Sequence, residues 1–383
     1  MIWTADGAPG SRKPFGAPGG LLLLLALAAA ACSGGGGAFT GNMTSPRHGH
    51  TATALPDGRV LIAAGLTKTS PLGTFELFEP LRSAFEALAI QGFRPRGWHS
   101  AAALKDGRIL LSGGWAGPFT ALREAAILHP GEKRLQPLLM LQGRYDHTST
   151  LLEDGAVLLA GGNDGRGEQR AMELFDPPSG KFAPAARPLL VPRQQHTATP
   201  LPGGQVLILG GGQGQGARLA EIYLPTERRT RLVRGFTSVS RSRHTATPLM
   251  DGRVLIAGGL GPERTLATAE IYDPGKDAFL PIQAPLRTAR QQHTATLLPD
   301  GRVVLLGGWG GGEGKTLDDG EIFDPQGSCF AALPFHMKAK RRLHTAALVR
   351  DGSILAAGGA SDDDVLPSAE LLRVPPRKPG RDC

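Results

Sequence analysis

Three polar residue types recur at fixed spacing along this chain of 383 residues, and each can do chemistry. A histidine returns at intervals of about fifty residues, and an arginine stands three residues before each histidine. A glutamate follows later in the same copy, except in the second copy, which has Ala126. The histidines are His50, His99, His147, His196, His244, His293 and His344. The arginines are Arg47, Arg96, Arg144, Arg193, Arg241, Arg290 and Arg341. The glutamates are Glu76, Glu173, Glu221, Glu270, Glu321 and Glu370.

A set of histidines can hold a metal ion or carry protons. If seven copies surround one axis, however, their imidazoles are spread evenly around it. A tetrahedral metal site needs three or four ligands within about 2.3 Å of one ion. We therefore expect the histidines to be structural, each hydrogen-bonded at the start of a strand. The sequence predicts no metal site and no cofactor.

The arginines allow two interpretations. Seven guanidinium groups around one mouth of a channel would attract anions, which makes these arginines candidate ligand-binding residues. Alternatively, each guanidinium bridges to carboxylates of the neighbouring copy and serves the fold. Both interpretations require an architecture that repeats one short segment around an axis.

The repeated segment reads as a β-hairpin. In the copy Arg241–Gly259, the alternation in His-Thr-Ala-Thr-Pro-Leu and a Val/Leu/Ile run that ends in glycines predict two strands. An Asp-Gly pair between them, replaced by Gly203-Gly204 in the fourth copy, accepts the positive φ angles of a tight turn. A third strand follows in each copy, as at 269–274, and a fourth follows it, as at 277–282. Four antiparallel strands repeated radially predict a β-propeller.

The pattern Arg-x-x-His-Thr-Ala-Thr, hairpin, Gly-Gly, Glu-Ile-Tyr-Asp-Pro and then an aromatic residue resembles the kelch repeat of bacterial secreted proteins. The resemblance covers residues 38 to 373. It implies an all-β fold, a seven-bladed β-propeller of kelch-type four-stranded blades. Kelch propellers serve as scaffolds, ligand-binding modules and, less often, enzymes, so the resemblance leaves the function open.

The chain is also distantly similar to the propeller domain of galactose oxidase, which holds copper with tyrosines, histidines and a cross-linked cysteine. The present sequence has three tyrosines, Tyr145, Tyr223 and Tyr272. Two of them occupy the repeated third-strand position, and no cysteine lies in an inner strand. We therefore expect no copper chemistry. Motifs for serine hydrolases, zinc proteases and phosphate loops are also missing. The sequence thus indicates no catalytic residues and predicts that the protein is not an enzyme.

The first 31 residues have a different character. Arg12 and Lys13 precede an apolar run at 21–31, and Cys32 follows at once. A basic flank, a short apolar segment and small residues predict a secretory signal over 1–31. The ending Ala29-Ala30-Ala31-Cys32 resembles a bacterial lipobox, although leucine is commonest at the position of Ala29. This resemblance implies a lipid on Cys32 and a place in the bacterial cell envelope, periplasmic or at the outer-membrane surface; ordinary secretion is the alternative.

Residues 32–37 are expected to form a flexible tether and residues 38–383 the propeller. The seventh copy lacks a clear fourth strand, because the prolines of the C-terminal tail remove hydrogen-bond donors from it. Phe39–Met43 resembles the end of a fourth strand, so we predict that this N-terminal strand closes the ring. The alternative is closure by Val374–Cys383 alone.

Charge and cysteine content restrict the partners. The formal charge is +8, and it becomes +7 without the signal segment, which carries +1. A basic balance favours acidic partners, but no lysine-rich run or aromatic platform indicates nucleic acid. We expect a monomer with a protein or glycan partner, and membrane contact through the lipid anchor. If Cys32 is acylated, Cys329 and Cys383 remain, and whether they pair is left open.

Residues that differ between the copies are better candidates for function than those that recur. They are concentrated in the loops after the Gly-Gly doublets, where Trp115 and Trp309 follow directly; Trp98 precedes His99. These aromatic rings can stack on sugars or anchor a peptide, or they pack between blades. The acidic runs at 362–364 and 163–164 lack the ligand spacing of a calcium loop, so we expect solvated loops there.

These observations predict a lipid-anchored extracytoplasmic binding or scaffold propeller that holds a protein or glycan on its variable-loop, Arg-rich face. The candidate ligand-binding residues are the seven arginines together with Trp115 and Trp309. The alternative is a carbohydrate-active enzyme, a hydrolase or lyase, that uses acidic residues over the channel.

Overall fold

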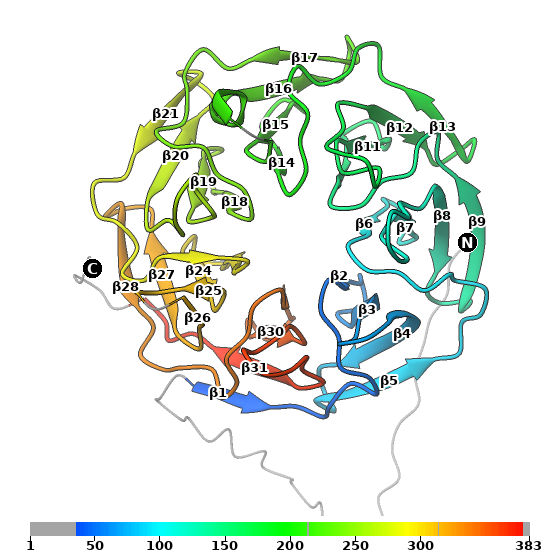
Figure 1. Ribbon diagram of the computed structural model, residues 1–383. Helices are drawn as coiled ribbons and strands as arrows, with labels where there is room; N and C mark the ends of the chain where they lie inside the picture. Colours follow the sequence, from blue (N-terminus) through cyan, green and yellow to red (C-terminus); the bar gives the residue numbers. More distant parts are fainter. Residues whose placement is uncertain (1–35, 213, 313, 378–383) are drawn as a thin grey trace, which may run out of the picture. The chain divides into compact units, whose positions relative to one another are not determined.

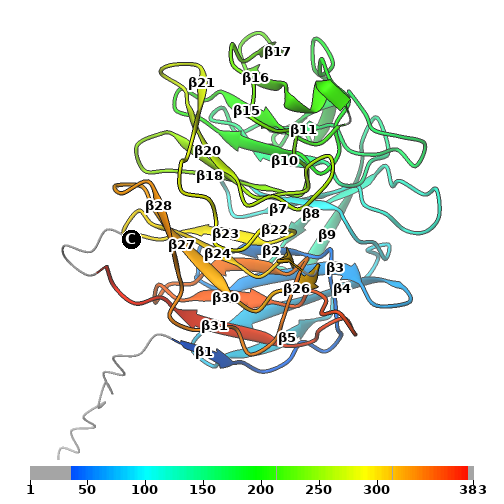
Figure 2. The same cartoon turned by 60° about the vertical axis from the view of Figure 1, so that its left-hand side comes forward.

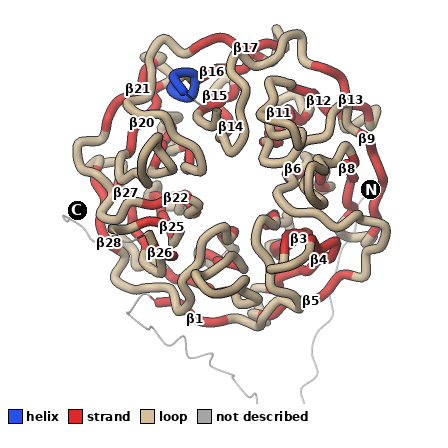
Figure 3. Tube along the Cα trace, viewed as in Figure 1, coloured by secondary structure: helices blue, strands red, loops and turns tan. Residues whose placement is uncertain are grey.

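The computed structural model describes residues 36–212, 214–312 and 314–377. Within these residues the regular structure is almost entirely β, in seven four-stranded antiparallel sheets and one small three-stranded sheet (Figure 1). The single 3-10 helix of the described residues, η1 (Gly214–Arg218), is the blue segment of Figure 3. The expected all-β propeller of four-stranded sheets is therefore confirmed.

The strands follow the order of the repeats. The first sheet contains β2 (Thr51–Ala54), β3 (Val60–Leu66), β4 (Pro71–Glu79) and β5 (Ala84–Leu88). The second contains β6 (Ser100–Ala103), β7 (Ile109–Ser112), β8 (Glu124–His129) and β9 (Arg134–Leu139). The third contains β10 (Thr148–Leu151), β11 (Val157–Ala160), β12 (Met172–Asp176) and β13 (Lys181–Pro184). The fourth contains β14 (Thr197–Pro200), β15 (Val206–Leu209), β16 (Ala220–Leu224) and β17 (Arg229–Leu232).

The remaining sheets repeat this order with two variations. The fifth contains β18 (Thr245–Pro248), β19 (Val254–Ala257), β20 (Ala269–Asp273) and β21 (Ala278–Pro281). The sixth contains β23 (Thr294–Leu297), β24 (Val303–Leu306), β27 (Gly320–Asp324) and β28 (Cys329–Ala332). The seventh contains β29 (Thr345–Leu348), β30 (Ile354–Ala357), β31 (Ala369–Arg373) and β1 (Gly36–Phe39). The small sheet contains β22 (Arg290–Gln291), β25 (Trp309–Gly310) and β26 (Lys315–Thr316).

The first strand of each repeat lies nearest the central axis (Figure 1). These inner strands contact one another in the cyclic order β2, β6, β10, β14, β18, β23, β29 and back to β2. Their Thr and Ala side chains are small, which suits seven strands that converge on one axis. The fourth strands lie at the circumference, with long connections back to the next inner strand.

The hydrophobic core consists of layers between neighbouring sheets. The second strand shows this best, because its side chains alternate between the two faces of its sheet. In β3, Leu61 and Ala63 pack against the second sheet, whereas Val60 and Ile62 pack against the seventh. Both faces are therefore buried, and each buried Val, Leu or Ile contributes about 1.5–3 kcal/mol. No sheet can bury its faces alone, so the repeats are stable only as a set.

The outer strand of the seventh sheet comes from the N-terminal end of the described chain. β1 pairs antiparallel with β31, from Gly36 opposite Arg373 to Phe39 opposite Glu370 (Figure 2). The pairing thus begins three residues before the predicted start and includes the last two residues of the predicted tether. After β1, the Met43 amide still donates to the Pro367 carbonyl, at 2.9 Å. Of the alternative closing segment, residues 374–377 form no strand.

Phe39 of this closing segment is not part of the hydrophobic core. Its side chain is 50% exposed, and Lys338 Nζ lies 5.1 Å above the ring. The buried residue of this segment is Met43, which is 3% exposed and packs in the layer between the seventh and first sheets. Phe39 lies on the face of the outermost strand that no other sheet covers.

The seven repeated histidines link neighbouring sheets. In six of them Nε2 hydrogen-bonds a threonine hydroxyl at the start of the preceding sheet's inner strand, as His99 does with Thr51 at 3.0 Å. His147 uses Ser112 Oγ instead, at 2.9 Å. The bond from His50 to Thr345, at 2.9 Å, joins the first sheet to the seventh. The histidines are structural, as expected.

The closing segment leads to a first prediction. Met43→Ala should lower the free energy of unfolding by about 2–5 kcal/mol, because it leaves a cavity between two sheets. Phe39→Ala should change it by only about 0.5 kcal/mol, because the ring is half exposed. Urea unfolding followed by circular dichroism measures both. Equal losses in the two variants would contradict this packing of the segment.

The histidines predict acid sensitivity. Burial lowers the pKa of all seven, to about 3 for His99, His196 and His344. The folded state keeps these rings neutral, while the unfolded chain protonates them near pH 6.5. The contribution of these histidines to the free energy of unfolding is therefore fully present above about pH 6.5. It is lost as the pH falls toward 3, by about 1.4 kcal/mol per pH unit for each histidine.

Urea unfolding between pH 7 and 4 tests this. In His293→Gln, the slope of the unfolding free energy against pH should be smaller than in the parent by about 1.4 kcal/mol per pH unit, which corresponds to one proton. His336→Gln is the matched control, because the His336 side chain is 67% exposed. The same slope in the parent and in His293→Gln would show that His293 does not resist protonation in the fold.

Candidate functional site at the channel mouth

The seven arginines do not line a channel mouth; they lie inside the sheets. All are at most 2% exposed. In each, Nη1 donates to the carbonyl oxygen of the residue 17 positions later, where the second strand ends. Their assignment as ligand-binding residues is therefore corrected, because no guanidinium is free for a ligand.

In six sheets the guanidinium also pairs with the repeated glutamate. Arg144 Nη2 lies 2.6 Å from Glu173 Oε1, and Arg341 Nη2 lies 2.7 Å from Glu370 Oε1. This carboxylate belongs to the third strand of the same sheet, not to a neighbouring sheet as we expected. Burial lowers the pKa of Arg144, and Glu173 opposes this shift. The four other pairs are Arg47–Glu76, Arg193–Glu221, Arg241–Glu270 and Arg290–Glu321.

The glutamates also hold the segments that enter each sheet. Glu173 accepts hydrogen bonds from the amides of Leu141 and Gln142, at 2.8 and 3.1 Å. The other five accept at least one amide from the equivalent segment. The Arg–Glu pair thus fastens the connection from the preceding sheet to the edge where the inner strand begins.

The second sheet holds its buried guanidinium without a carboxylate partner. Ala126 replaces the glutamate, and the guanidinium of Arg96 lies 4.2 Å from the centroid of the Phe93 ring. The Arg96 side chain donates to the Gly113 and Glu124 carbonyls, at 2.9 and 2.8 Å. Burial lowers the pKa of Arg96 to about 10, with only the more distant Glu124 opposing it. An aromatic face therefore replaces the ion pair here.

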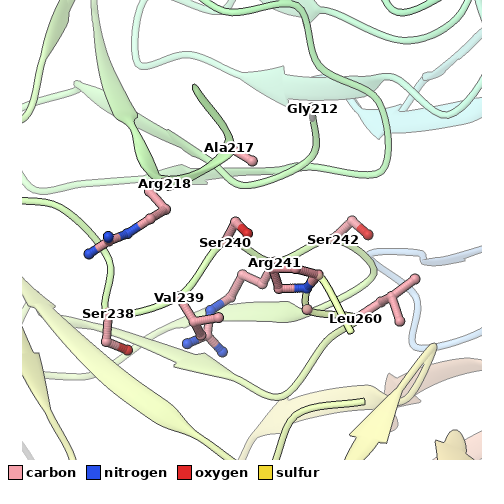
Figure 4. A pocket seen from close by; sticks show the side chains of 11 residues that line it. Gly212, Ala217, Arg218, Ser238, Val239, Ser240, Arg241, Ser242 and Leu260 are labelled. Carbon is pink, nitrogen blue, oxygen red and sulfur yellow. The ribbon is translucent and has the colours of Figure 1, made fainter. Parts of the chain in front are cut away.

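Figure 4 shows a cavity of about 650 Å³ between the fourth and fifth sheets, which contains one of these arginines. Arg241 lies along its wall, but its guanidinium bonds the Gly258 carbonyl and Glu270. Arg218 points away from Ser242 in this view, and its Nε donates to the Thr237 carbonyl at 2.9 Å. Both terminal nitrogens of Arg241 are thus engaged within its own sheet even beside a cavity, and its buried Nε has no hydrogen-bond partner among the described residues.

A second cavity lies on the axis, because residues of six sheets line it. It has a volume of about 640 Å³. Six of the residues that immediately precede the repeated histidines line it: Trp98, Asp146, Gln195, Arg243, Gln292 and Leu343. We call these six residues, together with Gly49 at the equivalent position of the first sheet, the rim. We call this cavity the channel mouth. It lies at the end of the sheets where the chain enters each inner strand.

The backbone of the rim is held in an unusual conformation. All seven residues have positive φ, from 52° at Trp98 to 58° at Gly49. Each amide from Trp98 to Leu343 donates to the carbonyl of the rim residue in the preceding sheet, at 2.9–3.1 Å. Six hydrogen bonds therefore run around the mouth. Glycine fits this conformation without strain, whereas any other L-residue costs about 1–2 kcal/mol.

One side of the mouth is aromatic. The Trp98 ring lies 5.4 Å from Trp115 and 6.3 Å from Tyr145, measured between centroids. His48 lies 6.2 Å from Trp98 on its other side. Trp115 is placed there because its backbone pairs with Gly97, beside Trp98. None of these four side chains is fully buried.

The other side is polar and connected. Gln195 Nε2 donates to Asp146 Oδ2 at 3.0 Å, and Arg243 Nε donates to Gln195 Oε1 at 2.8 Å. Asn163 Nδ2 donates to Gln194 Oε1 at 3.0 Å. Desolvation raises the pKa of Asp146, and its hydrogen bond to Gln195 opposes the shift. The mouth thus combines flat aromatic faces with fixed donors and acceptors.

The three tryptophans of interest separate into two places. Trp98 lines the mouth, and Trp115 does not line it but packs against the Trp98 ring. Trp309 lies in β25 and lines a different cavity, with Thr265 and Arg287 among its walls. Trp309 is therefore not brought to the site, although its sequence context matches that of Trp115.

The described part of the chain contains no group of three potential His, Cys, Asp or Glu metal ligands. Asp362 instead accepts hydrogen bonds from Thr316, at 2.6 Å for the hydroxyl. Cys329 is in a disulfide. Cys32 and Cys383 lie outside the described residues, as does the predicted signal segment.

The comparisons with known proteins concern the fold. A search of protein families finds no match, and a search of curated sequences finds none. Among solved structures, the chain is similar to a fungal alcohol oxidase of the AA5 family in complex with copper, with a TM-score of 0.73 and 18% identity over 88% of this chain and 76% of that one. This likeness identifies the class of fold, a β-propeller.

The comparison corrects the expectation that the protein is not an enzyme, because this neighbour is an oxidase. The described residues include no group of three His, Cys, Asp or Glu side chains placed to hold a metal ion. Tyr223 and Tyr272 are buried in the layers between sheets. We therefore derive no copper-dependent step. Among the described residues, no helix is long and apolar enough to cross a membrane.

The pairing of the arginines predicts unequal effects of the same substitution. Arg144→Met should lower the free energy of unfolding by about 3–5 kcal/mol, because it leaves Glu173 buried without a partner. Arg96→Met is the matched control and should cost about 1–3 kcal/mol, since it leaves only carbonyl groups unsatisfied. Urea unfolding at pH 7 compares them. A larger loss in Arg96→Met would contradict the proposed difference.

Proposed function

We propose that this protein is a kelch-type propeller of the bacterial cell envelope that binds a glycan at the channel mouth. The observation that carries the proposal is the rim. Six of its seven positions keep a side chain where glycine would be less strained, at a cost of about 1–2 kcal/mol each. The scaffold does not require these side chains, since Gly49 fits the same ring of hydrogen bonds. Their identities are best explained by contact with a ligand.

The chemistry of the mouth favours a sugar. Pyranose rings present flat C–H faces that stack on aromatic rings, and Trp98 and Trp115 are only partly buried. Their hydroxyl groups need donors and acceptors at fixed positions, which Asp146, Gln195 and Arg243 offer in one network. The cavity of about 640 Å³ is within the usual range for small ligands.

The envelope location is part of the proposal and rests on the N-terminal sequence. A signal over 1–31 and a lipid on Cys32 would hold the propeller at a membrane, where glycans are abundant. Labelled palmitate should be incorporated into the parent and not into Cys32→Ala. Equal labelling of the two would remove the anchor from the proposal and leave the binding site unaffected.

Sugar binding can be tested with hexasaccharides of cellulose, chitin, mannan and polygalacturonate, the last being acidic. Trp98→Gly, which copies the residue of the first sheet, should weaken binding of the preferred oligosaccharide about ten-fold. Trp309→Ala is the matched control and should not change it, because Trp309 lies at another cavity. Isothermal titration measures both. Equal loss in the two variants, or no binding of any oligosaccharide, would contradict the proposal.

A second candidate is a carbohydrate-active enzyme at the same mouth. Desolvation raises the pKa of both Asp146 and Glu168, and each accepts a hydrogen bond from one of the adjacent residues Gln195 and Gln194. A carboxyl that keeps its proton can act as a general acid toward a bound glycoside. Release of reducing ends from the bound oligosaccharide, abolished in Asp146→Asn, would favour this candidate over binding alone.

A further inference from the structure

A separate cavity lies between the third and fourth sheets, on the face opposite the channel mouth. It has a volume of about 340 Å³. Its walls come from the Asp-Gly turn of the third sheet and from the turns between third and fourth strands in both sheets. In a meander of four strands these turns share one end of the sheet, and the connections that form the mouth share the other. The cavity is thus independent of the site proposed above.

Two departures from the repeat create this cavity. In four sheets the Asp of the Asp-Gly turn pairs with an arginine two residues later, as Asp251 does with Arg253 at 2.7 Å. The third sheet has Ala156 at this position, so no arginine side chain covers Asp154. One Asp154 oxygen accepts the Ala156 amide at 2.9 Å, and no ion pair to Asp154 forms within the described residues.

The second departure concerns a buried tyrosine. In the fifth sheet, Tyr272 donates its hydroxyl to Asp277 at 2.9 Å. The fourth sheet has Tyr223 at the equivalent place, but Arg228 replaces the aspartate five residues later. Arginine cannot accept a hydrogen bond. Tyr223 is 0% exposed, and its hydroxyl accordingly has no hydrogen-bond partner. The residue lines the cavity.

A buried hydroxyl without a partner costs free energy comparable to a lost hydrogen bond, so its retention calls for an explanation. The cavity is far larger than the share of volume that one water needs, about 30 Å³. Burial raises the pKa of Tyr223 to about 12, with Arg228 opposing and Asp154 reinforcing the shift. The hydroxyl therefore keeps its proton at neutral pH, and the charges of Arg228 and Asp154 both act on it.

The surrounding groups have both signs. Arg228 and Lys181 offer positive charge, and Asp154 and Asp176 offer negative charge. Within the described residues none of these four forms an ion pair, and Asp176 accepts the Ser179 amide at 3.2 Å. Leu152, Leu174 and other apolar side chains line the same cavity. Unpaired charges of opposite sign above an apolar floor suit a small molecule that itself carries both charges and an apolar group.

We propose that this cavity binds a free amino acid with an apolar side chain. Its carboxylate accepts hydrogen bonds from the Tyr223 hydroxyl and the Arg228 guanidinium, and its ammonium group faces Asp154. Its side chain lies over Leu152 and Leu174. The ligand supplies the acceptor that Asp277 supplies to Tyr272 in the fifth sheet.

Isothermal titration of the full-length protein with L-leucine tests this site. L-leucine should bind, whereas N-acetyl-L-leucine and L-leucinamide, which lack the ammonium and the carboxylate charge, should bind at least about ten-fold more weakly. Tyr223→Phe should weaken L-leucine binding by about the same factor, and Tyr272→Phe should not. Phe is the natural residue here in the third and sixth sheets, at Phe175 and Phe323, so both variants should fold.

Arg228→Asp gives a second, independent readout. It recreates the Tyr272–Asp277 arrangement, so it should abolish L-leucine binding while the melting temperature stays the same or rises. No binding of L-leucine or L-phenylalanine at millimolar concentration would overturn the proposal. So would binding that is unchanged in both Tyr223→Phe and Arg228→Asp. A failure of sugar binding at the channel mouth would leave this site unaffected, because the two sites share no residue.

Discussion

The buried Arg–Glu pair is the interaction on which the other features depend. A β-strand that ends at a glycine doublet leaves carbonyl groups without ladder partners, and the connection from the preceding sheet arrives with unpaired amides. One guanidinium satisfies the carbonyls, and one carboxylate satisfies the amides. Each charge is acceptable in the interior because the other neutralises it. In six of the seven sheets the pair thereby fixes where the inner strand starts, and with it the position of the adjacent rim residue.

Constant and variable positions are separated within four consecutive residues. In Arg-x-x-His, the arginine fastens its own sheet, and the histidine fastens the neighbouring one. The two residues between them are held from both sides, so their backbone is rigid whatever side chains they carry. This explains how glycine, tryptophan, aspartate, glutamine, arginine and leucine share one conformation at the rim. A site built this way can change its ligand without changing its frame.

The repeat made the all-β propeller and its four-stranded sheets predictable, because hairpins, turns and periodicity are local properties. The burial of the arginines was not predictable in the same way. The burial depends on where each connection lies relative to the glycine doublet in three dimensions, and this position is not a local property of the sequence. The rim was missed although it left a signal, two variable positions inside an otherwise constant motif. The closing strand was misplaced by three residues, because Gly36-Gly37 reads as a linker yet its bare backbone pairs with β31.

The pairing of β1 with β31 builds the seventh sheet from strands more than 300 residues apart in the sequence. Among the four-stranded sheets of the described residues, the other six each use four strands of a single repeat. Before β31 has emerged, β1 lacks its pairing partner, and the face of the first sheet that carries Val60 and Ile62 lacks the strand β31 that helps to cover it. Closure of the ring is thus tied to the emergence of β31, and the gap between the first and seventh sheets is where a chain that lacks β31 is most exposed to association with others.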